Sequence, residues 1–284
     1  MGPIKGGFMI RIGMVNYINT APIYEMWKRS VHRPDWHITE APPSTLNRML
    51  DRDELDLGFV SSYEYAVRPQ KYRILRDLSI SADGPVGSVF LFSKVPIELL
   101  SGKCILLTGQ SETSIALTKI ILEEFYRIKP LYSVGEIFDF RNYDEDIVCV
   151  LAIGDEALRL KIQDAYPYRY DLAEIWNKTT GLPFVFAVFA VREDFVHSAA
   201  ETLREIWLTL LECRKKGIEQ LEEISSLVAP RIPMSSESCY QYLGTIQHIL
   251  SEKHRQALEK FFSYLIRRGE AHEDALPLKF FPQN

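Results

Sequence analysis

Short apolar runs alternate with helix-like segments along the first two thirds of the chain. The runs are rich in β-branched and aromatic residues and have the length of buried strands. They lie at residues 8–15, 37–40, 55–60, 72–78, 88–93, 103–108, 147–153 and 184–191. Between several of them, apolar residues recur at helical spacing, as in 22–27, 44–50 and 114–126. Strands that alternate with helices predict parallel sheets with crossover connections.

The starts of the predicted helices carry residues that favour helix N-termini. Pro22 suits a first helical turn, and Ser44 and Asp155 are predicted N-caps. Asn19 either caps the helix that Pro22 opens or points into a cleft. Beyond residue 193 the pattern is helical almost throughout, to about residue 269.

The strand–helix series occurs twice, which predicts two lobes. The chain leaves the first series near Pro96 and returns near Pro183. We therefore expect a first lobe of residues 8–95 plus 184–284, with 96–183 inserted as the second lobe. The terminal helices would pack on the first lobe, as in type 2 periplasmic-binding-protein folds. The alternative is one continuous doubly wound sheet.

Composition and charge exclude several classes of function. A net charge of −5 argues against non-specific nucleic-acid binding, and no apolar stretch is long enough to span a bilayer. The apolar run before Arg11 is too short for a signal peptide, and the four cysteines show no disulfide or metal spacing, so we expect a cytoplasmic protein. Dinucleotide, Walker A, serine-hydrolase and zinc-protease motifs are missing.

Polar loops follow the predicted strands, at the sheet edge where open α/β sheets bind ligands. They share hydroxyls, amides and glycines, contain no histidine, and are the segments 16–20, 61–62, 82–88, 109–114 and 154–155. Segment 109–114 opens a helix, whose free N–H groups attract a carboxylate, although plain capping is the simpler interpretation. Segment 82–88 predicts a turn with Ser88 free to donate. The residues alone predict a cleft for a small anion.

The loops, taken in order, resemble those of the chorismate dehydratase family of menaquinone biosynthesis. The resemblance covers about residues 10 to 190 and rests on these segments: RIGMVNYINTAPIY (11–24), DLGFVSSYEY (56–65), SISADGPVGSV (79–89), SETS (111–114), IGDEAL (153–158) and TGLPFVFA (180–187). It implies conversion of chorismate to 3-[(1-carboxyvinyl)oxy]benzoate with loss of water, on the futalosine route, by a periplasmic-binding-protein fold. It also implies no cofactor and no metal, because aromatisation drives the elimination.

The resemblance also implies roles for individual residues. Asn19 matches the asparagine of the family's first loop and is the expected catalytic position. An amide is no general base, so Asn19 would orient the substrate while the substrate's enolpyruvyl carboxylate takes the ring proton. The other expected contacts are with the substrate: Ser88, Thr113 and Ser114 for the anion, and Ser62, Gly87 and Asp155 along the cleft.

Three other functions fit a two-lobed fold of this kind. A solute receptor would bind a small anion and return it unchanged. Dihydroxynaphthoate synthase, of the same pathway, would need a histidine near the cleft for its acid–base work. A ligand-sensing regulatory domain would carry a DNA-binding extension, which the sequence lacks.

Overall fold

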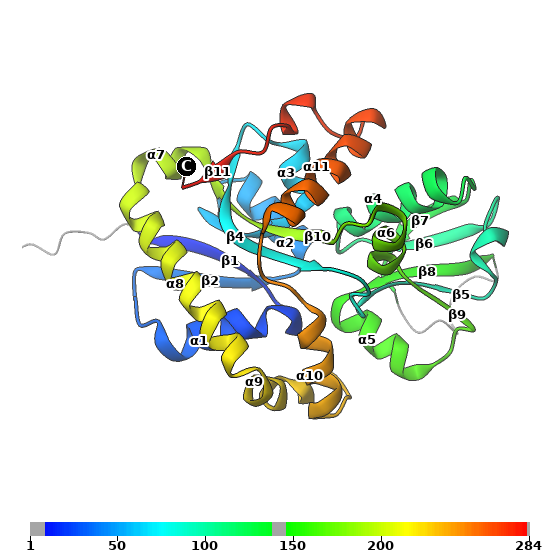
Figure 1. Ribbon diagram of the computed structural model, residues 1–284, viewed down its shortest axis with the longest axis horizontal. Helices are drawn as coiled ribbons and strands as arrows, with labels where there is room; N and C mark the ends of the chain where they lie inside the picture. Colours follow the sequence, from blue (N-terminus) through cyan, green and yellow to red (C-terminus); the bar gives the residue numbers. More distant parts are fainter. Residues whose placement is uncertain (1–8, 138–145, 283–284) are drawn as a thin grey trace, which may run out of the picture.

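Two sheets form the centres of two lobes in the computed structural model, which describes residues 9–137 and 146–282 (Figure 1). The first sheet has the strand order β11-β4-β10-β3-β1-β2. Its strands are β1 (Ile10–Val15), β2 (Trp36–Ala41), β3 (Leu57–Ser61), β4 (Tyr72–Ala82), β10 (Phe184–Arg192) and β11 (Phe280–Phe281). The second sheet has the order β7-β6-β8-β5-β9. Its strands are β5 (Val89–Ser93), β6 (Cys104–Thr108), β7 (Leu131–Gly135), β8 (Ile147–Ile153) and β9 (Tyr168–Asp171).

Both sheets are mixed, so the expectation of parallel sheets is wrong in part. Strand β1 is parallel to β2 and β3, and β6 is parallel to β7 and β8. Strand β10, however, is antiparallel to β3 and β4, and β5 is antiparallel to β8 and β9. Strands β4, β5 and β10 adjoin the crossings between the lobes. An apolar run in the sequence indicates a buried strand, but it does not show whether that strand is parallel or antiparallel to its neighbours.

The first crossing lies earlier than residue 96. Strand β5 is hydrogen-bonded within the second sheet, whereas the sequence pattern assigned it to the first lobe. The chain therefore crosses between Ala82 and Val89. Strand β4 also continues past the predicted strand 72–78, as far as Ala82. Strand β10 begins at Phe184 and returns the chain to the first sheet.

Helices cover the sheets, and the C-terminal helices pack on the first lobe as predicted (Figure 1). Helix α8 packs on α1, with Gly217 against the backbone of Pro22, and α11 packs on β10 and α3. The helices associated with the first lobe are α1 (Ala21–Ser30), α2 (Pro43–Asp51), α3 (Ser62–Val67), α7 (Glu193–Ser198), α8 (Ala200–Glu219), α9 (Leu221–Val228), α10 (Ser236–Thr245) and α11 (Glu252–Arg267). Those of the second are α4 (Glu112–Lys119), α5 (Gly154–Gln163) and α6 (Leu172–Thr180).

Several helix starts differ from the predicted ones. Helix α2 begins at Pro43, so Ser44 lies inside its first turn. Helix α5 begins at Gly154 after Ile153, so the predicted capping role of Asp155 is wrong. Asn19 lies in the short helix η1 (Ile18–Thr20) and does not cap α1. A capping residue in the sequence therefore predicts a helix start only to within one or two residues.

An aromatic cluster joins the lobes on the side of the crossings. Trp176 of α6 lies edge-on to Phe184 and Phe261, with ring centroids 5.2 and 6.3 Å away. Its indole N–H donates to the carbonyl oxygen of Pro183 at 3.0 Å. Because a buried indole needs such a partner, this contact holds α6 beside the return crossing.

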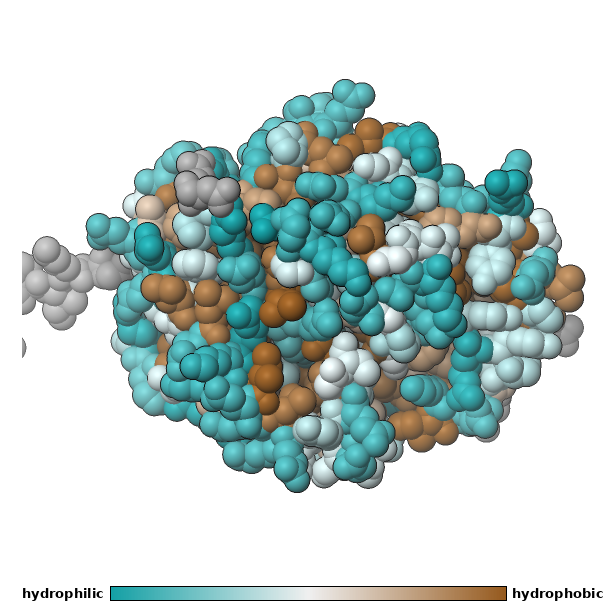
Figure 2. All heavy atoms as spheres, in the orientation of Figure 1, coloured by the Kyte–Doolittle hydropathy of each residue, from teal (hydrophilic) through white to brown (hydrophobic). Residues whose placement is uncertain are grey.

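On the face of the molecule shown in Figure 2, hydrophilic residues are interspersed with separate groups of apolar residues. Within residues 9–137 and 146–282, no helix combines the length and the apolar character needed to cross a membrane.

Candidate active site

A narrow cavity lies between the lobes, at the carboxyl ends of β1, β3 and β8 and the N-terminus of α4. Its volume is about 50 Å³, well below the roughly 300–1,000 Å³ of ligand pockets. The lobes are therefore closed on each other, and a ligand of ordinary size requires them to separate. The lining residues are Val15, Tyr17, Asn19, Pro43, Ser61, Ile80, Val86, Ser88, Val89, Ser111, Ser114, Ile153, Gly154, Phe186 and Ala187.

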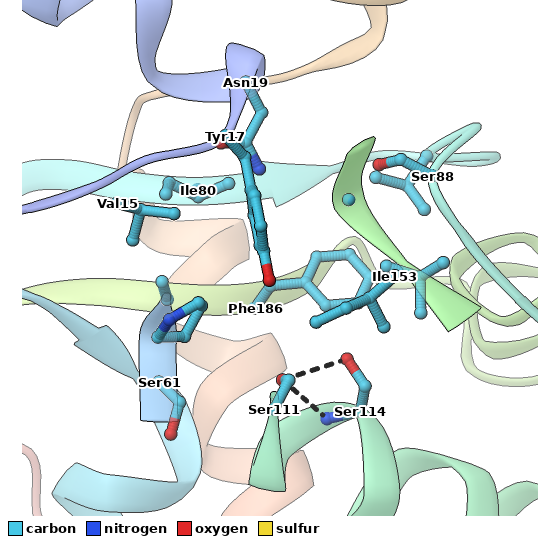
Figure 3. A pocket seen from close by; sticks show the side chains of 15 residues that line it. Val15, Tyr17, Asn19, Ser61, Ile80, Ser88, Ser111, Ser114, Ile153 and Phe186 are labelled. Atoms are coloured by element: carbon cyan, nitrogen blue, oxygen red, sulfur yellow. Dashed lines mark hydrogen bonds between the residues drawn. The ribbon is translucent and has the colours of Figure 1, made fainter. Parts of the chain in front are cut away.

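The lining is apolar apart from hydroxyl and amide groups. Figure 3 shows the Tyr17 ring extending into the cavity, above Ser111 and Ser114. Val15, Ile80 and Phe186 supply apolar walls suited to a carbocyclic ring. Among the described residues that line the cavity, none carries a formal charge. An anion bound here would be held by neutral donors.

Hydrogen bonds between the lobes hold them closed around this cavity. The Tyr17 hydroxyl donates to Gln110 Oε1, and the Ile18 N–H donates to Asp155 Oδ1 at 3.2 Å. The Tyr63 N–H donates to Thr113 Oγ1 at 2.9 Å. The groups of Thr113 and Asp155 expected to meet a ligand are therefore paired with the first lobe in this closed form.

The predicted residues separate into two groups. Asn19, Ser88 and Ser114 line the cavity, although 19 and 88 are far from 114 in the sequence. Gly87 lies on another hollow, between α5 and α10, and its N–H donates to Asp171 Oδ2 at 2.7 Å. Thr113 and Asp155 also lie outside the cavity lining.

Ser61 lines the cavity, whereas its neighbour Ser62 does not. Ser62 is buried, and its hydroxyl donates to the carbonyl oxygen of Val185 at 2.7 Å. Ser61 ends β3 and caps α3, whereas Ser62 is the first residue of α3, so the chain turns between them and their side chains have different surroundings. The sequence motif identified the pair Ser61 and Ser62, but it did not show which of the two lines the cavity.

The serine hydroxyls of the cavity have donors already directed at their oxygens. Ser61 Oγ accepts from Asn47 Nδ2 at 2.9 Å and from the Glu64 N–H at 3.2 Å. Ser114 Oγ accepts from the Ser111 hydroxyl at 3.1 Å, because Ser111 Oγ in turn accepts from the Ser114 N–H. Each hydroxyl has one hydrogen, so Ser61 and Ser114 keep theirs for a ligand. The cavity thus presents hydrogen-bond donors, as an anion requires.

Asn19 presents an unpaired acceptor at the cavity. Its Oδ1 atom is buried and has no hydrogen-bond partner, and a buried unpaired amide oxygen is costly. Its backbone oxygen accepts from His248 Nε2 at 2.7 Å. His248 comes from the segment between α10 and α11, so sequence analysis of the loops could not find it. Burial lowers the pKa of His248 to about 4, so its ring is neutral near pH 7.

The buried His248 is expected to make stability depend on pH. Its folded pKa of about 4 lies below the ordinary 6.5, so the unfolded chain binds the extra proton between these values. The free energy of unfolding therefore falls as the pH drops through this window. Between about pH 7.5 and about pH 5, the loss from this group is on the order of 2 kcal/mol. Urea unfolding of the wild type and His248→Gln at both pH values measures it.

Comparison of the wild type with His248→Gln separates the effect of His248 from that of groups whose pKa shifts change the free energy of unfolding in the opposite direction. Burial raises the pKa of Glu64 to about 7, which weakens folding as the pH rises, but Glu64 is present in both proteins. The advantage of the wild type over His248→Gln should shrink at the lower pH. A pH-independent difference between them would contradict the assignment.

Among the described residues, no group of three or more His, Cys, Asp or Glu side chains is arranged to hold a metal ion. The two sheets and the cavity between the lobes define a two-lobed α/β protein with the periplasmic-binding-protein fold. A protein of Archaeoglobus fulgidus of known structure superposes with a TM-score of 0.74 at 21% identity, over 92% of this chain and 97% of that one. The periplasmic aliphatic sulphonate binding protein of Escherichia coli superposes with a TM-score of 0.65 at 12% identity, over 93% and 94%. At these identities the likeness concerns the fold alone.

Sequence comparison identifies the family. Residues 10–267 match the menaquinone biosynthesis family. The chorismate dehydratase of Thermus thermophilus is 30% identical over 269 residues, which cover 88% of this chain and 93% of that protein. The chorismate dehydratase of Campylobacter jejuni is 30% identical over 182 residues, 63% of this chain and 66% of that protein. The chain belongs to the chorismate dehydratase family of menaquinone biosynthesis, which is a family of hydro-lyases.

Proposed function

We propose that this protein removes water from chorismate and releases 3-[(1-carboxyvinyl)oxy]benzoate for the futalosine route to menaquinone. The observation that carries the proposal is the uncharged, largely apolar cavity, which is lined by Asn19, with its unpaired Oδ1, and by several serines. Chorismate has complementary groups: an apolar ring face, a ring hydroxyl and two carboxylates. The family relationship favours the same substrate.

The proposed reaction needs no group outside the cavity and the substrate. The substrate's enolpyruvyl carboxylate takes the ring proton and then gives it to the ring hydroxyl, which leaves as water while the ring becomes aromatic. As the proton leaves, negative charge spreads onto the ring carboxylate. Hydroxyls of Ser88, Ser114 and Ser61 directed at that carboxylate would stabilise the developing charge more than the ground state.

Asn19 would orient the ring. Its free Oδ1 accepts a hydrogen bond from the substrate hydroxyl, which satisfies the buried oxygen and directs the leaving group. For Thr113 and Asp155 we propose a role in closure, because both pair across the lobes. A cytoplasmic location belongs to the proposal and suits four free cysteines.

Incubation of the purified protein with chorismate, without added cofactor, tests the proposal directly. Mass spectrometry should detect the aromatic ether and loss of chorismate in proportion to enzyme concentration. Recovery of bound but unchanged chorismate would favour the solute receptor instead. If chorismate neither binds nor reacts, both functions are excluded for this substrate.

A further inference from the structure

Tyr242 of α10 is buried and reaches Ser88 from outside the cavity. Its hydroxyl donates to Ser88 Oγ at 3.0 Å, across 154 residues of sequence. Burial raises the pKa of Tyr242, so the phenol keeps its proton. Tyr242 is not among the residues that line the cavity, whereas Ser88 is. The tyrosine lines the separate hollow between α5 and α10, and it reaches the cavity through its bond to Ser88.

The bond from Tyr242 determines what Ser88 offers. A phenol has a single hydrogen, and here it is given to the serine oxygen. The serine hydrogen is then left for another acceptor. The backbone of Ser88 is held as well, because its carbonyl oxygen accepts from the Gly154 N–H at 2.7 Å. The two contacts define the position of the Ser88 hydroxyl and leave it as a hydrogen-bond donor.

The same helix also contacts the two residues that precede Ser88. Thr245 Oγ1 donates to the carbonyl oxygen of Tyr242 at 2.7 Å, and it lies 3.3 Å from the carbonyl oxygen of Val86, two residues before Ser88. The ring of Tyr242 lies 3.6 Å from the position that a Cβ on Gly87 would take. Helix α10 thus packs against the crossing that carries Ser88, and Tyr242 is the part of it that reaches the serine hydroxyl.

We propose that Tyr242 is a positioning residue that makes the Ser88 hydroxyl a hydrogen-bond donor to a carboxylate in the cavity. The inference rests on the proposed function, since the carboxylate is that of chorismate or its product. Without the phenolic hydroxyl, the Ser88 side chain can rotate, and its hydroxyl no longer has to donate to the carboxylate. Neighbouring Ser61 and Ser114 are polarised by other donors, so the effect of Tyr242 is specific to Ser88.

The variant Tyr242→Phe tests the proposal with the ring retained. We expect about tenfold weaker binding of the stable product 3-[(1-carboxyvinyl)oxy]benzoate by calorimetry, and about tenfold lower kcat/KM with chorismate. Tyr240→Phe is the matched control, because Tyr240 is on the same helix and exposed. The control should bind and react like the wild type.

A double-mutant cycle separates positioning from a general structural role. In a Ser88→Ala background, Tyr242→Phe should cause no further loss, because the oxygen that it polarises is gone. An equal loss in both backgrounds, or wild-type affinity and kcat/KM in Tyr242→Phe, would overturn the proposal. A wild type that binds product but does not convert chorismate would reject the proposed reaction alone. A wild type that binds no product would overturn the role of Tyr242.

Discussion

Replacement of Asn19 by alanine is expected to lower kcat for chorismate by about 10²–10³-fold, the range found when one oriented polar group is removed from an active site. The variant removes the unpaired Oδ1 atom that would meet the ring hydroxyl. The bond from His248 goes to the backbone oxygen of residue 19 and is retained, so the loop should keep its position. Steady-state kinetics with chorismate, together with thermal unfolding to verify the fold, measure the effect.

Asn16→Ala is the matched control for Asn19→Ala. Asn16 lies three residues earlier in the same loop and does not line the cavity, and its Oδ1 is likewise buried without a partner. The control should retain kcat and KM within about a factor of three of the wild-type values, since its side chain does not line the cavity and the bonds of residue 16 with Arg231 and Ala41 use the backbone. Wild-type kcat in Asn19→Ala would exclude the catalytic assignment of Asn19.

Replacement of Gly154 by alanine is expected to prevent the lobes from closing fully. Gly154 opens α5 in the second lobe with φ of 56°, and an added Cβ would lie 2.8 Å from the ring of Tyr17 in the first lobe. Displacement of the lobes by about 1 Å would cost on the order of 10²-fold in kcat/KM. Kinetics with chorismate and small-angle scattering of the product complex should detect lost turnover and a larger radius of gyration.

Gly181→Ala separates the clash from backbone strain. Gly181 follows α6 with φ of 72°, and no atom lies within 4 Å of the position of an added Cβ. This control carries a strain of about 1 kcal/mol and no contact with the opposite lobe. It should keep wild-type kcat/KM with a slightly lower Tm. Equal losses of activity in the two variants would mean that strain, and not closure, explains the effect of Gly154→Ala.

The order of elements and the type of fold were accessible from the sequence because they depend on local pattern. The apolar run at 147–153 predicted β8, and Pro22 predicted the start of α1. Strand direction at the crossings and the sheet that contains β5 were not predictable in this way. Both depend on which strands meet after the chain has crossed, and apolar periodicity contains no such information.

In the candidate site, too, some residues were predictable from the sequence and others were not. The loop motifs identified Asn19, Ser88 and Ser114, and all three line the cavity. The choice of Ser62 over Ser61 differs from the lining of the cavity, because the exact residue at which β3 ends and α3 begins decides which serine faces the cleft.

By itself, the sequence determined the two-lobed fold, the polar loops and the family. Only the tertiary structure decided how those loops are supported. Tyr242 reaches Ser88 across 154 residues, and His248 reaches Asn19 across 229 residues. Helical and strand preferences act over a few neighbouring positions, whereas such contacts arise when separately formed elements pack together. The polarity of the Ser88 hydroxyl and the anchoring of Asn19 are therefore properties of the packed C-terminal helices and not of the loop motifs.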